Sequence, residues 1–473
     1  MSNHDSKYRI FKIKEELDKT GPGFCLAKWY HVSMHLHTGQ NHSCYHPTPH
    51  YTPLEEVQAN PLALHNTSHK KKMRKLMLEG QRPSECSYCW DIEDLPEVNG
   101  EPNISDRMLR SGEDWTYHLM EETRTMPWDA DVYPRYLELN FGNECQLKCS
   151  YCAPMASSRW FAETEQHGLY PMENPVNYLQ YDSTSLKRPG GLYRDEDLNP
   201  YIKAFWEWFP DAYPHLHVLR FTGGEPLLSK NVFKVIDHIR ANPRPDLEFS
   251  INSNMSVPDK LMDKFIENMA DIKRNNKIRA VQVFTSVDTW GPQAAWIRHG
   301  LDLERYEKNL NRWMTEVPDA QFSFMITFCL LAIPNFKELL DKILEFRRKY
   351  NTPRVPFQPY IQRITFDTPY TLEPPHLTGR IADQWFYDKL DENLAYMKTL
   401  VDNEDIFKFT TIEYLKLQRT HSWIKENQYK SDELAMNRRD FAIFVDEHDR
   451  RRGTNWHAAF PELLPFYNMC KSS

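Results

Sequence analysis

Residues 136–154 read YLELNFGNECQLKCSYCAP, a short apolar segment followed at once by Cys145, Cys149 and Cys152. The alternating apolar residues of Tyr136–Asn140 predict a buried strand, so the cysteines lie on the loop at its carboxyl end. Three thiolates on one loop hold three irons of a cubane cluster and leave the fourth iron open. The spacing therefore predicts an iron–sulfur cluster with an open position, and a zinc site completed by a nearby histidine is the alternative.

Short apolar segments alternate with amphipathic stretches after Arg135. This alternation is typical of a parallel sheet with crossover helices, and six strands suit a partial barrel. The predicted strands are Tyr136–Asn140, His217–Phe221, Leu247–Asn252, Val281–Val287, Gln321–Phe328 and Val355–Ile361. The predicted helices are Asn199–Phe209, Asn231–Ala241, Asp259–Lys273, Asp302–Val317 and Asn335–Lys349. The predicted fold class is α/β.

Composition divides the chain of 473 residues into three predicted domains. Residues 1–125 are rich in cysteine and histidine and are predicted to form a small, loop-rich module that includes a helix over Lys70–Gly80. Residues 126–372 carry the strands of the partial barrel. Residues 373–473 are predicted to form a helical C-terminal extension.

Charge and hydropathy exclude several classes of protein. The formal net charge of −8 gives no strong affinity for nucleic acid, and no apolar run approaches the ~20 residues that a membrane helix needs. Charged residues stand where a signal peptide carries its apolar region, which predicts a cytoplasmic protein. In that reducing compartment, nine cysteines, seven of which lie in the first third of the chain, indicate metal or redox chemistry rather than disulfides.

A second motif, RFTGGEPLL, follows the second predicted strand at its carboxyl end. Gly223 and Gly224 allow a close approach of the backbone to a ligand, and the Glu225 carboxylate suits a cationic amine. Taken alone, Gly-Gly-Glu is also an ordinary turn.

Together, the cysteine loop with Tyr151 and the Gly-Gly-Glu-Pro motif resemble the radical S-adenosylmethionine (SAM) superfamily. The resemblance implies a partial (β/α)6, TIM-like barrel and a [4Fe-4S] cluster that binds SAM and cleaves it to a 5′-deoxyadenosyl radical. It also implies that Cys145, Cys149 and Cys152 are cluster ligands, that Tyr151 packs near adenine, and that Gly223 to Glu225 bind the SAM amino group.

Further polar residues follow the next strands in the order that the resemblance implies. Asn252 and Asn254 end the third predicted strand, and Ser286 and Asp288 end the fourth. These positions resemble ribose-contacting residues of the superfamily, and Arg298 resembles an arginine aimed at the SAM carboxylate. A guanidinium suits a carboxylate, and amides or hydroxyls suit a ribose. The alternative for each residue is a cap or turn at the end of a strand.

The N-terminal domain carries a second set of cysteines, namely Cys25, Cys44, Cys86 and Cys89. Their pattern resembles the auxiliary-cluster module called SPASM or twitch, here placed before the barrel. Four cysteines imply one auxiliary [4Fe-4S] cluster with no open iron. A four-cysteine zinc ribbon is the alternative, and histidines of the same stretch, His31 to His46, are possible substitute ligands.

The resemblance implies a radical SAM enzyme that abstracts hydrogen from a peptide or protein side chain. A nucleotide, sugar or small metabolite is the alternative substrate. An external electron donor such as flavodoxin or ferredoxin is implied as a partner. A rival reading is a non-catalytic zinc protein that binds nucleic acid through its basic run, Lys70–Lys75.

Overall fold

The computed structural model describes residues 3–96, 103–174, 196–352, 363–366 and 374–473. The chain forms two compact units that interleave along the sequence. The first comprises residues 1–142, 188–223 and 244–249, and the second comprises residues 143–187, 224–243 and 250–473. The three predicted domains stay a prediction.

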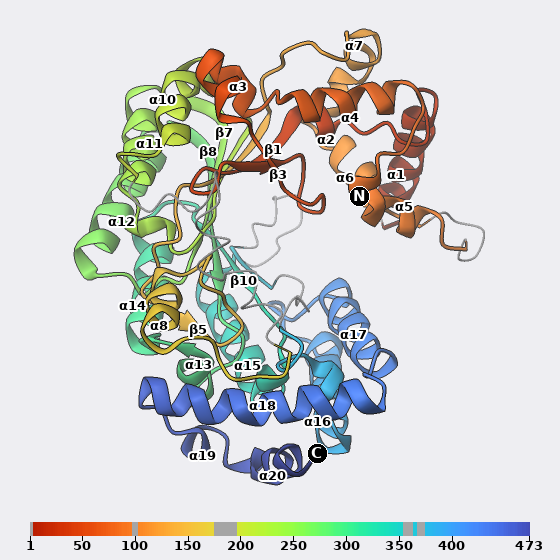
Figure 1. Ribbon diagram of the computed structural model, residues 1–473. Coiled ribbons are helices and arrows are strands. Elements are labelled where there is room, and N and C mark those ends of the chain that lie inside the picture. The colour runs from red at the N-terminus through yellow and green to blue at the C-terminus, as the bar shows by residue number, and fades with distance from the viewer. Residues whose placement is uncertain (1–2, 97–102, 175–195, 353–362, 367–373) are drawn as a thin grey trace. The chain divides into compact units, whose positions relative to one another are not determined.

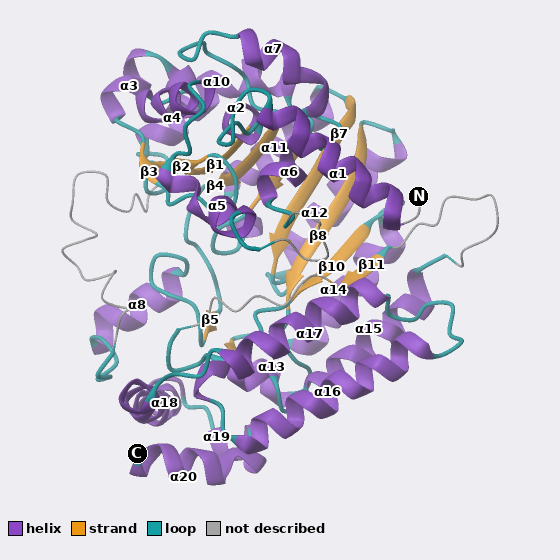
Figure 2. Cartoon of the chain, turned by 90° about the vertical axis from the view of Figure 1, so that its right-hand side faces the viewer, coloured by secondary structure: helices purple, strands orange, loops and turns teal. Residues whose placement is uncertain are grey.

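Nine strands form one sheet in the order β11-β10-β8-β7-β6-β4-β1-β2-β3 (Figures 1 and 2). Its strands are β1 (His31–His35), β2 (Gln40–His42), β3 (His50–Tyr51), β4 (Tyr136–Asn140), β6 (Val218–Phe221), β7 (Arg244–Ser253), β8 (Ile278–Ser286), β10 (Gln321–Met325) and β11 (Ile364–Phe366). The pairs β1–β4, β4–β6, β8–β10 and β10–β11 are parallel. The predicted α/β class is confirmed, although the described strands form no closed barrel.

The first five predicted strands are confirmed as β4, β6, β7, β8 and β10. The sixth, Val355–Ile361, lies outside the described residues, and β11 takes the place next to β10. Strand β1 was not predicted, because its sequence HVSMH is short and rich in histidine. It pairs in register with β4, so that His31 lies opposite Tyr136 and His35 opposite Asn140.

The five predicted helices that follow the strands are confirmed. They are α10 (Pro200–Ala212), α11 (Lys230–Ala241), α12 (Asp259–Arg274), α14 (Leu303–Glu316) and α15 (Phe336–Tyr350). Polar side chains fix where several begin: Asn199 caps α10, Ser229 caps α11 and Asp302 caps α14. No described helix is long and apolar enough to cross a bilayer.

The N-terminal residues of the first unit are more helical than predicted. Their helices are α1 (Asn3–Asp18), α2 (Ala27–Tyr30), α3 (Leu54–Ala59), α4 (Ser68–Leu78), α5 (Ser87–Glu93), α6 (Asp106–Ser111) and α7 (Met120–Thr125). A buried core that includes Phe24, Trp29 and Met77 joins α1, α2, α4 and α7, and Cys25 and Cys86 pack against this core. These two cysteines are therefore held by ordinary hydrophobic packing.

The second unit ends in the predicted helical extension. Its further helices are α8 (Ser158–His167), α13 (Pro292–Ile297), α16 (Gln384–Asp402), α17 (Thr411–Glu426), α18 (Ser431–Arg452), α19 (Trp456–Ala459) and α20 (Leu464–Ser472). Helix α18 lies along α20 (Figure 1). Trp296 of α13 stacks on His448 of α18, with ring centroids 3.8 Å apart, and packs against Trp456. The extension therefore shares a core with the elements that follow β8.

Candidate functional site

The cysteine loop of the second unit is tied into a small sheet. Lys148 and Cys149 form β5, which pairs antiparallel with β9 (Arg298–His299). Cys149 is buried, and Cys145 and Cys152 are half-buried. Burial raises the pKa of all three thiols, that of Cys152 to about 12, and the neighbouring cysteines add to the effect at Cys145 and Cys152. The three thiols of the loop therefore share a largely buried environment.

Three successive carbonyls of this loop each accept a hydrogen bond from a side chain. The Ser157 hydroxyl donates to Leu147 O at 2.8 Å. Arg452 Nη1 donates to Lys148 O at 2.6 Å, and Trp160 Nε1 donates to Cys149 O at 2.8 Å. The backbone next to Cys149 is thus fixed on several sides.

Tyr151, Asp288 and Arg298 meet beside Cys149. Asp288 accepts two hydrogen bonds from the Arg298 guanidinium, at 2.8 and 3.0 Å, and a third from the Tyr151 hydroxyl at 2.8 Å. Arg298 Nη1 also lies 3.6 Å from Cys149 Sγ. Both Asp288 and Arg298 are buried. In this arrangement the Arg298 guanidinium contacts Asp288 and Cys149. Its pairing with the SAM carboxylate stays a prediction.

The two glycines of the Gly-Gly-Glu motif allow the chain to pass close to other backbone. A Cβ on Gly224 would lie 2.4 Å from Glu144 O, and a Cβ on Gly223 would lie 2.5 Å from Asn140 Oδ1. Gly223 also has φ of +123°, a conformation that side chains rarely adopt. Gly224 therefore lies against the start of the cysteine loop in the second unit. Gly223 lies against the end of β4 in the first unit.

Glu225 ties the motif to the end of β7. Its carboxylate accepts from the Ser253 hydroxyl at 2.9 Å, from Asn254 N at 2.7 Å and from Leu227 N at 3.2 Å. Asn254 Oδ1 in turn accepts from Gln146 Nε2 and from Ser256 N, both at 2.9 Å. Glu225 and Asn254 thus act as caps in this structure, which was the alternative given for Asn254.

The remaining predicted SAM contacts lie at neighbouring strand ends. Asn252 lies in β7, and its Nδ2 is 3.7 Å from Met325 Sδ of β10. Ser286 is the last residue of β8 and lies opposite Met325 in the register. Both side chains are half-buried. Their predicted roles at a ribose stay predictions.

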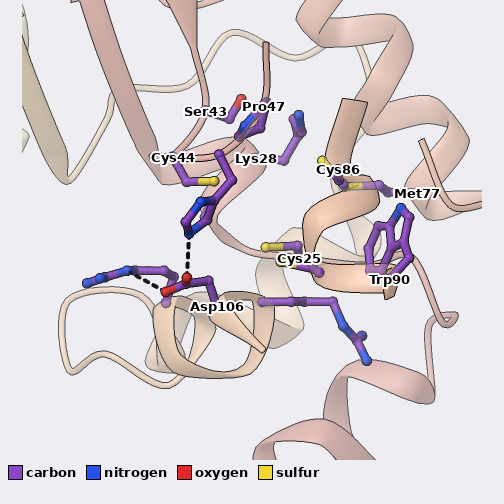
Figure 3. Close-up of a pocket in the computed structure, with 14 residues that line it drawn as sticks. Cys25, Lys28, Ser43, Cys44, Pro47, Met77, Cys86, Trp90 and Asp106 are labelled. Atoms are coloured by element: carbon purple, nitrogen blue, oxygen red, sulfur yellow. Dashed lines mark hydrogen bonds and ion pairs between the residues drawn. The ribbon is translucent and has the colours of Figure 1, made fainter. Parts of the chain in front are cut away.

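The four N-terminal cysteines line one cavity of the first unit (Figure 3). The other lining residues are Ala27, Lys28, Ser43, His46, Pro47, Met77, Trp90, Asp106, Arg107 and Arg110. Figure 3 shows the labelled Cys25, Cys44 and Cys86 around the cavity. Burial raises the pKa of each thiol, that of Cys44 to about 12. The four cysteines that were predicted to act as one set therefore lie together in the fold.

Three cations, Lys28, Arg107 and Arg110, line this cavity, and each is paired with a carboxylate. The Lys28 side chain is 2% exposed and pairs with Glu85. Burial opposes the charge of Lys28, but Cys86 and Glu85 outweigh it and raise the pKa of the ammonium. Arg107 is held by bidentate contact with Glu93 at 2.8 Å. A buried cation next to a cysteine set suits an anionic ligand in the cavity.

The histidines of this stretch are poor substitute ligands. Among His31, His35, His37, His42 and His46, only His46 lines the cavity. His46 already contacts Asp106 at 2.5 Å, and His35 and His42 face one another at 3.1 Å. The contacts favour cysteine as the ligand type here.

Within the part of the chain that the structure describes, no three His, Cys, Asp or Glu side chains are already arranged to hold a metal ion. The donor chemistry of both cysteine sets nevertheless fits an iron–sulfur cluster, because thiolates are the soft ligands that such clusters use. Since burial raises the thiol pKa values, ligation must release protons.

A polar face crosses three parallel strands of the first unit. Ser33, Glu138 and Arg220 lie opposite one another in β1, β4 and β6, and His35 lies opposite Asn140. Residues in register point to the same side of a sheet. Arg220 Nε and Glu138 Oε2 are 3.8 Å apart, and both side chains are mostly buried. Parallel strands are usually apolar on both faces, so this polar, internally paired face is unusual.

Sequence reasoning missed the residues that hold the cysteine loop from outside its motif. Trp160 and Glu163 lie one helical turn apart on α8, directly after the loop. This spacing could have predicted that both side chains lie on the same face of the helix. Arg452 lies 300 residues away and belongs to a run of arginines that reads as a solvated helix end. No local pattern identifies it.

Comparison with known proteins gives two findings. Residues 139–346 match the Radical SAM superfamily. The chain is also 24% identical over 226 residues to the GTP 3′,8-cyclase of Sulfurimonas denitrificans. The aligned segment covers 46% of this chain and 54% of that relative. The chain thus spans about half the length of this curated relative. No solved structure gives a significant match.

Glu225 predicts a pH dependence of stability. Burial raises the pKa of its carboxyl from 4.5 to about 7, although three hydrogen bonds oppose the rise. The folded chain therefore holds this proton more tightly than the unfolded chain. The contribution of this bound proton to the free energy of unfolding is complete below pH 4.5. That contribution falls by roughly 3 kcal/mol at most as the pH rises to about 7.

We expect the melting temperature of the wild-type protein, relative to Glu225→Gln, to fall between pH 5 and pH 7. Subtracting the melting temperature of the variant from that of the wild type removes the contribution of all other titrating groups. Thermal unfolding followed by circular dichroism at several pH values measures the difference. A difference that stays constant over this range would contradict the assignment to Glu225.

Proposed function

We propose that this chain, an iron–sulfur enzyme whose residues 139–346 form a radical SAM domain, cleaves SAM reductively and abstracts hydrogen from a polar substrate. The observation that carries the proposal is the cysteine loop of that domain. It places Cys145, Cys149 and Cys152 on one anchored loop, with a buried arginine directed at Cys149.

In this proposal the three cysteines hold the catalytic [4Fe-4S] cluster. When bound, the cluster supplies the electron that cleaves SAM to a 5′-deoxyadenosyl radical. Arg298 donates to the Cys149 sulfur, and Asp288 fixes the guanidinium by two hydrogen bonds. Tyr151, Gly223, Gly224, Asn252 and Ser286 are proposed SAM contacts, as the resemblance implies. Flavodoxin or ferredoxin is the proposed electron donor.

Cys25, Cys44, Cys86 and Cys89 are proposed to hold one auxiliary [4Fe-4S] cluster, as in SPASM and twitch modules. Two features of the first unit support this. The four thiols line one cavity, and Lys28, Arg107 and Arg110 supply positive charge around it. A cluster with four thiolate ligands is anionic, so these cations stabilise it. A zinc ion in the same cavity is the alternative.

The proposed substrate is a small polar metabolite, with a nucleotide as its first candidate. The predicted preference for a peptide side chain is less well supported, because one curated relative is a GTP 3′,8-cyclase. The polar face of β1, β4 and β6 adds a structural argument. It offers a guanidinium, a carboxylate and an amide, which suit the phosphate and base of a nucleotide.

The cysteine loop gives the first test. Cys149→Ala should abolish formation of 5′-deoxyadenosine from SAM under reducing conditions, because it removes one of three cluster ligands. Iron analysis should show that the N-terminal set still binds metal. Cys470→Ala, which removes a buried cysteine of neither set, is the matched control. Undiminished 5′-deoxyadenosine in Cys149→Ala would overturn the proposed function.

The N-terminal cysteines give a separate test. Wild-type protein reconstituted without oxygen should carry about eight irons, and the double variant Cys86→Ala, Cys89→Ala about four. The variant should still cleave SAM, whereas its yield of modified substrate should fall. About one zinc and about four irons in the wild-type protein would instead assign these cysteines to a zinc site.

Nucleotide binding tests the substrate class. We expect GTP to bind the wild-type protein and to bind Arg220→Gln about ten- to a hundredfold more weakly, because a charged hydrogen bond is lost. Arg279→Gln, which alters an exposed arginine of the second unit, should bind as the wild type does. Calorimetry on the anaerobic protein measures all three. No detectable binding of GTP or ATP would exclude a nucleotide and return the peptide as the leading substrate.

A further inference from the structure

Helix α18 ends in three arginines that have different surroundings. The Arg450 side chain is 58% exposed and pairs with Glu447 of its own helix. Arg452, the last residue of the helix, has a side chain that is 0% exposed. Gly453 follows with φ of +65° and ends the helix in the left-handed conformation. The Arg452 side chain is therefore buried at a helix end where Arg450 is exposed, whereas arginines are usually solvated.

The Arg452 guanidinium is hydrogen-bonded on all its nitrogens. Nη1 donates to the Lys148 carbonyl at 2.6 Å. Nε and Nη2 each donate to a carboxylate oxygen of Glu163, both at 3.1 Å. The guanidinium also lies 4.4 Å from the ring of Trp160. A bidentate, stacked arginine of this kind is held in one geometry, which lysine does not reproduce.

The partners of Arg452 connect it to Cys149 by two routes. Lys148 immediately precedes Cys149, so the hydrogen bond to its carbonyl acts on the backbone beside the ligand. Trp160, which packs against the guanidinium, donates to the Cys149 carbonyl at 2.8 Å. Glu163 completes the set, because it also contacts Lys148 Nζ and accepts from the Tyr170 hydroxyl at 3.0 Å.

Two cations of this set, Arg452 and Lys148, surround the buried carboxylate of Glu163. Burial favours a neutral Glu163, but Arg452 and Lys148 outweigh it and lower the pKa of the carboxyl to about 2. Removal of Arg452 would leave Glu163 with one cation and Lys148 O without its donor. Breaking a buried pair of this kind is much more costly than losing a surface pair.

We propose that Arg452 is a positioning residue that holds the backbone of Lys148 and Cys149 in the conformation that receives the catalytic cluster. This inference rests on the proposed function for the cluster itself. It gives the C-terminal extension a role in the chemistry of residues 139–346, although Arg452 lies outside the region that matches the superfamily. Arg452 touches neither substrate nor the reacting atoms in this account.

The test compares Arg452→Met and Arg452→Lys with Arg450→Met, the exposed arginine of the same turn. Amide hydrogen exchange in the apo protein measures the loop without any cluster. We expect exchange at residues 147–152 to be about ten- to a hundredfold faster in Arg452→Met, because a charge-assisted hydrogen bond is lost. Arg452→Lys should fall between the two, and Arg450→Met should match the wild type.

A second measurement connects the loop to the cluster. After anaerobic reconstitution, Arg452→Met should lose iron from the catalytic site and show an altered electron paramagnetic resonance spectrum, whereas Arg450→Met should not. If Arg452→Met does not fold by circular dichroism, Arg452→Lys carries the comparison. Unchanged exchange and unchanged iron in the folded Arg452 variants would overturn the inference.

The two proposals fail in distinguishable ways. If Cys149→Ala kept its iron and its 5′-deoxyadenosine, the proposed function would fall, while faster exchange in Arg452→Met would still establish a purely structural contact. If the cluster assignment held and exchange were unchanged, only the role of Arg452 would fall.

Discussion

The arrangement of the cysteine loop depends on hydrogen bonds to its backbone. The carbonyls of Leu147, Lys148 and Cys149 accept from Ser157, Arg452 and Trp160. A loop that must present three thiols to one cluster loses much conformational freedom, and these donors reduce that cost before any ligand binds. The donors come from the loop's own helix α8 with its cap, and from α18 at the far end of the chain. One of these donors thus lies about three hundred residues after the loop that it fixes.

The two cysteine sets share burial but differ in their charged neighbours. At the catalytic loop, Arg298 faces Cys149 and is itself fixed by Asp288. In the first unit, Lys28 and Arg107 are buried next to the cavity and are paired with carboxylates. Each set thus has a cation whose position is fixed by an acidic partner. This pattern favours anionic clusters in both places over neutral core cysteines.

Local patterns predicted much of the fold and the candidate site. The alternation of apolar strand-like segments with amphipathic stretches predicted β4, β6 and β8. The spacing of the cysteines identified residues that the fold brings to one loop or one cavity. What they did not predict depends on distant pairing. Strand β1 is defined by its register with β4, and Arg452 acquires its contacts only when α18 packs against α8. The internal hydrogen bonds of Glu225 and Asp288 likewise depend on tertiary contacts, and the predicted contacts of these residues with SAM stay predictions.

In the proposed function, one cluster has an open iron and the other does not. Mössbauer spectroscopy of protein reconstituted with iron-57 tests it most directly, because it separates irons by their coordination. The account predicts that SAM changes the signal of about one iron in eight and leaves the auxiliary cluster unchanged. A spectrum with about eight irons and no response to saturating SAM would contradict it, as would a protein in which only four irons bind and all lie in the first unit.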